Sequence, residues 1–293
     1  MTKTYKKFNA FDIINTLLMT IIICITLYPL LYVVAISFSS SEFVQANMVK
    51  IIPKGFNFGA YAEVMGNEFF WTAYKNTILY TVVGTSINLV FTCTLAFCLS
   101  RKELIFRDAI SILVVLTMFF SGGLIPNFLL IKWLGMYNTI WAIVIPGAIS
   151  TYNMIIVRTY MQGLPEEIFE SVRIDGGNDL QIYLKIVLPL SKPVIATIGL
   201  FYAVGHWNSY FAPMIYFKDR ALYPLQIILR EMIVEQTFQD MAGDLAEAFG
   251  QSPPTSEMLI SSSIVIALIP ILCVYPFIQK YFVKGVMIGS LKG

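Results

Sequence analysis

Charged residues are scarce in this chain. Only 13% of its 293 residues are Asp, Glu, Lys or Arg, whereas soluble domains carry about 25%. Apolar residues make up 57% of the chain, and the mean hydropathy is +0.71. A soluble globular fold does not need so much apolar material, so the composition favours an integral membrane protein.

Residue types that carry catalysis or hold metals are also few. The chain has one histidine, His206, and four cysteines without a Cys-x-x-Cys pair, so we expect reduced thiols and no metal site. No Gly-x-x-x-x-Gly-Lys-Ser/Thr loop occurs, which removes that kind of phosphate cradle. His206 has no serine or cysteine partner at a recognisable spacing, so no hydrolytic triad is predicted. We therefore expect a chain that is not an enzyme and holds no cofactor, and that relies on another chain if ATP drives it.

Six apolar runs are long enough to cross a bilayer, which takes about 20 residues. They lie at residues 13–38, 77–99, 109–131, 139–160, 194–217 and 258–281. The first run is longer than the apolar core of a signal peptide, so we expect it to remain as a membrane helix. The sequence predicts an all-α integral membrane protein, with six transmembrane helices forming a single domain over residues 1–293.

The basic residues predict the orientation. An N-terminus in the cytoplasm places most of the 20 lysine and arginine residues on that side. The positive-inside rule then predicts that both termini, and the polar insert at residues 164–193, face the cytoplasm. The acidic segment 219–257 would face outward, either to meet a partner or simply to be solvated.

The insert at residues 164–193, between the fourth and fifth predicted spans, has the signals of two short helices. Pro165 suits the first position of a helix, and the glutamates after it complement the positive end of the helix dipole. Asp175, Gly176 and Gly177 can end that helix, because glycine accepts a positive φ. We expect a glycine elbow there.

The second short helix has its own start and stop. Asn178 can cap its first turn, with Gln181 as the reciprocal partner of a capping box, and Pro189 is expected to stop it. Its apolar side chains are predicted to share one face, which could offer a ridge to a groove on a partner. These side chains are Leu180, Tyr183, Leu184 and Val187.

The insert resembles the EAA loop of ATP-binding-cassette (ABC) importer permeases, whose pattern runs Glu-Ala-Ala, Gly-Ala and Ile-x-Leu-Pro with set spacers. The residues that match in register are Glu170, Gly176, Ile186, Leu188 and Pro189. Ser171, Val172 and Gly177 replace the usual alanines with other small or modest side chains. Similarity to the maltose-type carbohydrate permeases, and especially to their polysaccharide and oligosaccharide branch, extends through residues 121–126, 138–150, 188–193 and 207–208.

This resemblance implies a permease subunit in a bacterial cytoplasmic membrane, in contact with lipid, that imports an oligo- or polysaccharide fragment. It implies as partners a second homologous permease, a dimeric cytoplasmic ATPase that holds ATP and Mg, and an extracytoplasmic solute-binding protein, with no nucleic acid. The implied ATPase-coupling residues are Glu170, Asp175, Gly176, Leu180, Tyr183, Leu184 and Pro189.

Polar side chains inside the spans are costly in lipid and usually face the bundle interior or a watery path. Asn208 offers an amide to sugar hydroxyls, and Trp207 and Tyr210 offer flat rings to the apolar face of a sugar. Together with Asn88 and Asn153 they form the predicted substrate path. The alternative for the asparagines and for His206 is hydrogen bonding between helices.

Other functions fit the sequence less well. An ion-coupled secondary transporter needs carboxylates near the middle of its spans, and these spans contain essentially none. A membrane enzyme lacks its catalytic residues, and a structural scaffold leaves the insert without a purpose. The ion-coupled transporter and an ABC permease for a solute other than a sugar remain as alternatives.

Overall fold

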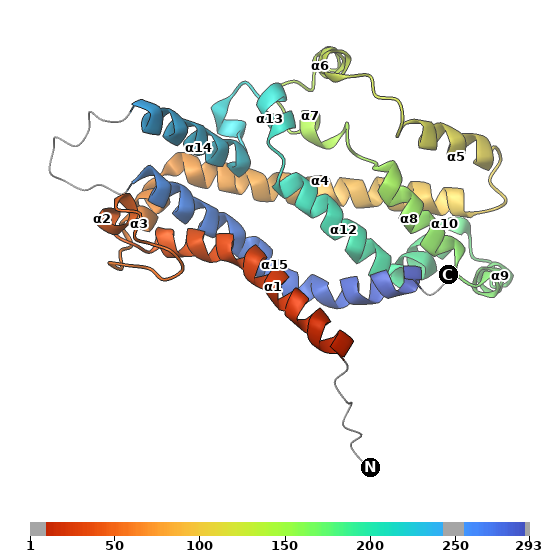
Figure 1. Cartoon of the computed structure of the whole chain (residues 1–293). Coiled ribbons are helices and arrows are strands. Elements are labelled where there is room, and N and C mark those ends of the chain that lie inside the picture. Colours follow the sequence, from red (N-terminus) through yellow and green to blue (C-terminus); the bar gives the residue numbers. More distant parts are fainter. Residues whose placement is uncertain (1–9, 243–254, 291–293) are drawn as a thin grey trace. The chain divides into compact units, whose positions relative to one another are not determined.

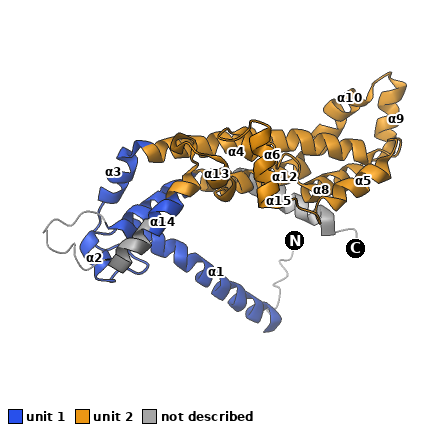
Figure 2. Cartoon of the chain, turned by 90° about the horizontal axis from the view of Figure 1, so that it is seen from above, with its two compact units in different colours: residues 1–68, 229–269 blue, residues 69–228, 270–293 orange. Residues whose placement is uncertain are grey.

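The computed structural model describes residues 10–242 and 255–290, and every element of secondary structure in these ranges is helical (Figure 1). This confirms the predicted all-α class. Residues 243–254 of the predicted outer segment, and both chain termini, lie outside the described residues. The chain divides into two compact units, residues 1–68 with 229–269 and residues 69–228 with 270–293 (Figure 2).

Three helices are long and apolar enough to cross a membrane. They are α1 (Ala10–Ser37), α4 (Glu68–Ser100) and α15 (Ser256–Ser290), the last over Ser256–Pro276. Most of α1 is an exposed apolar surface, as expected of a helix surrounded by lipid. These helices cover the predicted runs 13–38, 77–99 and 258–281, and each of them is continuous.

The first unit packs around the C-terminal end of α1. Two short helices, α2 (Ser41–Gln45) and α3 (Gly59–Gly66), follow α1 along the chain. They contribute Val44 and Ala60 to a core that also contains Ile36 and Met258. The long helix α14 (Leu225–Ala242) belongs partly to each unit.

The other three predicted runs are not continuous helices in the structure. Run 109–131 consists of α5 (Arg107–Leu116) and α6 (Leu124–Trp133). Run 139–160 consists of α7 (Trp141–Val144) and α8 (Thr151–Gln162), and run 194–217 of α12 (Lys192–Trp207) and α13 (Phe211–Tyr216). Six crossings remain a prediction.

Local backbone chemistry accounts for these breaks. Gly123, just before α6, has a φ of +84°, which glycine adopts without strain. Pro146 follows the end of α7, and the ring of Pro213 in α13 would clash in a continuous helix with the carbonyl of Ser209. Apolar composition therefore predicted membrane depth but not helical continuity.

The breaks separate two buried clusters of the second unit. One cluster holds residues of α4, α8 and α12, with Val114 of α5 packed against it. The other holds Ile131, Ala142 and Tyr216, next to partly buried residues of α6, α7 and α13. Each divided run therefore passes from one cluster to the other through its non-helical segment.

Candidate functional site

The insert forms two short helices, as predicted. The first is α9 (Glu166–Ile174), and the second runs through α10 (Asp179–Gln181), the π-helix η1 (Ile182–Val187) and α11 (Leu188–Leu190). Pro165 lies one position earlier than expected, at the N-cap of α9 rather than inside its first turn. This leaves residues 175–178 as the connection between the two helices.

That connection is a Schellman motif. Gly176 has a φ of +78°, the N–H of Gly177 donates to the carbonyl of Val172 (2.8 Å), and the N–H of Gly176 donates to the carbonyl of Arg173 (3.0 Å). Gly177 is needed for a different reason, because a Cβ there would lie 2.9 Å from the Val172 carbonyl oxygen. The predicted glycine elbow and its positive φ are confirmed.

The start of the second helix is also as predicted. The side chain of Asn178 accepts a hydrogen bond from the Gln181 N–H (2.9 Å), and the Gln181 side chain accepts one from the Asn178 N–H (3.1 Å). This reciprocal capping box satisfies two backbone donors that the first turn of a helix leaves free. The two caps together fix where each short helix ends and begins.

The predicted stop at Pro189 is wrong. Pro189 lies inside the helical segment, directly after the wide turn of η1, which gives its ring room that an α turn denies. The chain instead bends by 79° between Asp179–Leu190 and Lys192–Trp207. Ser191, at the bend, is fully buried.

The predicted apolar ridge is also only partly right. Tyr183 stacks on Phe97 of α4 at a centroid distance of 5.0 Å, and Val187 is buried in the core. Leu180 and Leu184 are exposed. The π-helix explains this difference, because its i to i+5 repeat puts Ile182 and Val187, both buried, on the same side.

The exposed residues near the elbow combine apolar and acidic groups. Ile174, at the end of α9, has 85% of its surface exposed. Glu170 is exposed, and among the described residues its carboxylate has no hydrogen bond or ion pair. Asp175, the C-cap of α9, is exposed as well. Such a surface can accept apolar and basic groups from another protein.

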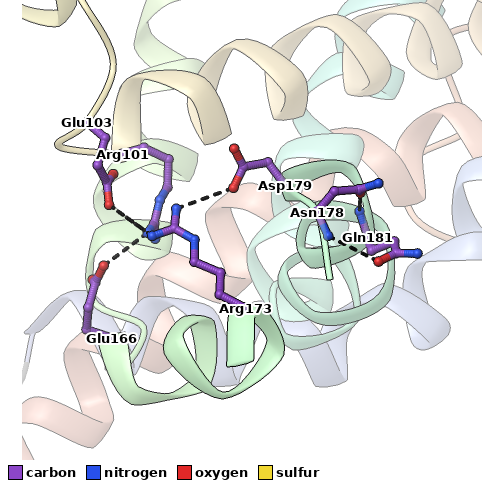
Figure 3. A network of polar contacts seen from close by, with 7 residues as sticks. All are labelled: Arg101, Glu103, Glu166, Arg173, Asn178, Asp179 and Gln181. Carbon is purple, nitrogen blue, oxygen red and sulfur yellow. Dashed lines mark hydrogen bonds and ion pairs between the residues drawn. The ribbon is translucent and has the colours of Figure 1, made fainter. Parts of the chain in front are cut away.

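Two arginines tie both short helices to the segment that follows α4 (Figure 3). Arg101 pairs with Glu166 in the first turn of α9 (3.0 Å), and its guanidinium lies 4.2 Å from the centre of the Phe169 ring. Arg173, near the end of α9, reaches both Glu103 and Asp179, each at 3.4 Å. The elbow region is thus connected to α4 by charged contacts as well as by packing.

Arg101 is the better protected of the two arginines. Its side chain is 14% exposed and covers Phe169, which is buried. Exposed ion pairs contribute at most about 1 kcal/mol each, whereas a cation over an aromatic ring contributes about 0.5–2 kcal/mol depending on burial. A backbone N–H and the neighbouring Arg101 and Arg173 lower the pKa of Glu103, which keeps this carboxylate charged at neutral pH.

Sequence patterns alone indicate little of this network. Arg101 lies 65 positions from Glu166 and Arg173 lies 70 positions from Glu103, so spacing along the chain predicts neither ion pair. The available signal was the acidic first turn of α9, which needs a basic neighbour whenever it packs against protein. The spacing of residues along the chain does not predict that Arg101 is this basic neighbour.

Asn88, one of the predicted path residues, is fully buried. Its Nδ2 donates to the carbonyl of Gly147 (2.6 Å), and its Oδ1 contacts Nε2 of His206 (2.7 Å). Gly84 makes room for His206, since any Cβ at that position would overlap the imidazole. In this structure Asn88 therefore bonds helices together, the alternative raised above, and exposes no atom to a solute.

Tyr202 gives similar support to the break before α8. Its hydroxyl accepts a hydrogen bond from the Ser150 N–H (2.9 Å) and lies 2.7 Å from Oγ1 of Thr92. Irregular backbone at membrane depth needs such partners. Asn153, in the first turn of α8, is also buried.

The remaining path candidates lie at the end of α12. Trp207 is buried and meets the ring of Tyr74 edge-on at 6.1 Å. Asn208, the C-cap of α12, is exposed and bonds through Nδ2 to the Val204 carbonyl of its own helix (2.9 Å). Tyr210, in the break before α13, is exposed. Of the five residues, only Asn208 and Tyr210 present substantial surface.

Comparison with known proteins finds similar membrane transport proteins over almost the whole chain. Residues 7–288 match the protein family described as "Binding-protein-dependent transport system inner membrane component". The polygalacturonan/rhamnogalacturonan transport system permease protein YtcP of Bacillus subtilis (strain 168) is 42% identical over 289 residues, which cover 98% of this chain and 100% of that protein. Protein LplC of the same organism is 40% identical over 288 residues, 98% of this chain and 97% of that protein.

A solved structure is similar over nearly the whole chain. It is the crystal structure of a bacterial ABC transporter involved in the import of the acidic polysaccharide alginate. The match has a TM-score of 0.86 at 35% sequence identity, and covers 96% of this chain and 100% of that chain.

Proposed function

The chain belongs to the family of binding-protein-dependent transport system inner membrane components, and we propose that it is a membrane subunit of an ABC importer for carbohydrates. It is a permease subunit that catalyses no reaction itself. The observation that carries the proposal is the joint match, over almost the whole chain, to a polygalacturonan/rhamnogalacturonan permease and to an alginate importer.

The cargo is an oligo- or polysaccharide fragment. Support comes from the names of these relatives and from the exposed Asn208 and Tyr210 beside a helix break, an amide and a ring suited to sugar hydroxyls and C–H faces. Broken helices are a common way to place polar groups at a transport site within a membrane. Asn88 and Asn153 support these elements from within.

The elbow of the insert is the contact for a cytoplasmic ATPase, which binds ATP and Mg. Glu170 would pair with a basic group there, while Ile174, Leu180 and Leu184 give exposed apolar contacts. Gly176 sets the angle between the two short helices, and Tyr183 anchors the second helix to α4.

Motion at the elbow would then reach the membrane helices directly. Arg101 and Arg173 connect α9 and α10 to the end of α4, and the second helix leads through the bend at Ser191 into α12. A movement imposed by ATPase closure is therefore passed on as a displacement of packed helices. Binding protein loaded with sugar would bias the same equilibrium from the other side.

The assembly contains a second homologous permease, an ATPase dimer and an extracytoplasmic binding protein, and this chain crosses the membrane several times with both termini in the cytoplasm. An ion-coupled secondary transporter does not fit a binding-protein-dependent family. An ABC permease for another solute is the alternative that the experiment must separate.

The test is reconstitution of the complete assembly in vesicles with ATP inside. We expect a panel of oligosaccharides to contain at least one whose uptake requires ATP and binding protein. Uptake driven by an ion gradient without ATP would refute the importer. ATP-dependent uptake of peptides or amino acids, with none of any glycan, would refute the carbohydrate assignment alone.

A further inference from the structure

We infer that residues 117–123, between α5 and α6, are a contact surface for the second permease subunit. The inference rests on the proposed function in one respect only, namely that the working assembly holds two permease chains. It is carried by the unusual combination of free backbone groups and exposed aromatic side chains in one short segment.

This segment lies at membrane depth without being helical. Residues 109–131 contain no charged side chain. Helix α5 has 10 residues, so it spans about 15 Å, half of the roughly 30 Å of a bilayer core. Helix α6 does not continue it, since Figure 1 looks along the axis of α6 while α5 lies across the view. Residues 117–123 must therefore cover much of the remaining depth.

The hydrogen bonding of the backbone stops partway along this segment, although the N–H groups of Thr117 and Met118 bond to the carbonyls of Val114 and Val115. The N–H groups of Phe119 and Phe120 still bond to the carbonyl of Leu116, at 3.0 and 3.2 Å. Beyond them, the Gly123 N–H reaches only the Ser121 Oγ at 3.3 Å, and within the described residues the N–H groups of Ser121 and Gly122 have no acceptor. Hydrocarbon cannot satisfy such groups, so lipid is a poor cover for this surface.

The side chains of this segment are equally unfavourable in contact with water. Phe119 is 76% exposed, Phe120 75% and Ile125 72%, and Ser121 is the one polar side chain between the two phenylalanines and α6. A group of large apolar side chains exposed together marks an interaction site rather than a solvated wall. An aqueous sugar path would need more polar groups than this segment offers.

A protein surface meets both requirements, because it supplies hydrogen-bonding groups and apolar contact together. Gly122 and Gly123 help, since small residues let another membrane helix approach closely. The described part of this chain leaves the segment exposed, and another chain within the membrane can supply the cover. In the assembly that chain is the second permease.

The test places the photoreactive residue benzoylphenylalanine at Phe120 in the complete importer in lipid nanodiscs. The matched control is Leu113, which is 65% exposed but lies inside α5, where the backbone is satisfied and lipid can cover it. We expect irradiation to join the Phe120 variant to the second permease, identified by the mass of the adduct. An adduct with lipid alone, at Phe120 as at Leu113, would overturn the inference.

A second measurement tests whether residues 117–123 line a water-filled path instead of a protein contact. Ser121→Cys should lose its reaction with a water-soluble maleimide when the importer is assembled, while Ile52→Cys, on an exposed loop, keeps it. Full reaction of Ser121→Cys in the assembly, with and without ATP, would overturn the contact. If sugar uptake persists in such an assembly, the proposed function stands and only the contact is rejected.

Discussion

Replacing Gly176 by alanine should weaken coupling through backbone strain alone. Gly176 has a φ of +78°, and a Cβ built there meets nothing within 4 Å, so no steric clash adds to the strain. The left-handed conformation costs an alanine about 1–2 kcal/mol. The strain is relieved if the elbow opens, that is, if residue 176 leaves the positive φ and the hydrogen bonds of the elbow break. The population of the hydrogen-bonded elbow then falls relative to the opened one by a factor of about 5–30.

The control is Gly176→Asn, since asparagine tolerates the left-handed region far better than alanine. The affinity of the purified ATPase for the detergent-solubilised permease pair should fall about 5–30-fold for Gly176→Ala and much less for Gly176→Asn. ATPase stimulation by sugar-loaded binding protein should fall in the same order. Equal affinities for the two variants, or no loss for alanine, would refute the argument from positive φ.

Gly177→Ala should have a larger effect for a different reason. Its Cβ would lie 2.5 Å from Val172 Cγ1 and 2.9 Å from the Val172 carbonyl oxygen. The carbonyl cannot move without breaking the hydrogen bond that closes the elbow. Asparagine offers no rescue here, so Gly177→Asn should be at least as damaging, which separates crowding from backbone strain.

Three further outcomes are expected. Asn88→Leu leaves the Gly147 carbonyl and His206 without partners and should destabilise the assembly by about 1–3 kcal/mol, whereas Asn208→Leu, at an exposed position, should lower sugar uptake at an unchanged melting temperature. Uptake that follows melting temperature in both variants would contradict this division. Arg101→Ala removes a 3.0 Å ion pair and the contact with the Phe169 ring, and should reduce ATP-driven uptake while the subunit still reaches the membrane; Arg101→Lys should restore only part of it, because lysine keeps the charge but lacks the planar stacking group. Wild-type uptake by Arg101→Ala would show that the network does not transmit motion. An impermeant thiol reagent on intact cells should label Ile52→Cys and not Glu167→Cys; the reverse pattern would overturn the proposed topology.

Much of the insert could be predicted from sequence because its signals are local. A positive φ at Gly176 and the reciprocal cap of Asn178 and Gln181 depend on residues within one helical turn, and both are present. Which side chains of the second helix face the core was harder to predict from the sequence. A π-helix differs from an α-helix by one residue per hydrogen-bonded turn, and this small difference turns Val187 inward and leaves Leu184 outside.

The sequence by itself determined that this protein lies in a membrane, that it is helical, and where the glycine elbow lies. Apolar content and the residues that start and stop helices act over short distances along the chain. Only the tertiary structure decided which polar residues serve the fold. Asn88 and Asn208 are both asparagines in apolar runs, yet one is enclosed by Gly147 and His206 while the other stays at an exposed helix end. The same holds for Arg101 and Glu166, which are far apart along the chain and 3.0 Å apart in space. Contacts of this kind depend on how helices pack, and packing is set by the whole chain rather than by any one segment of it.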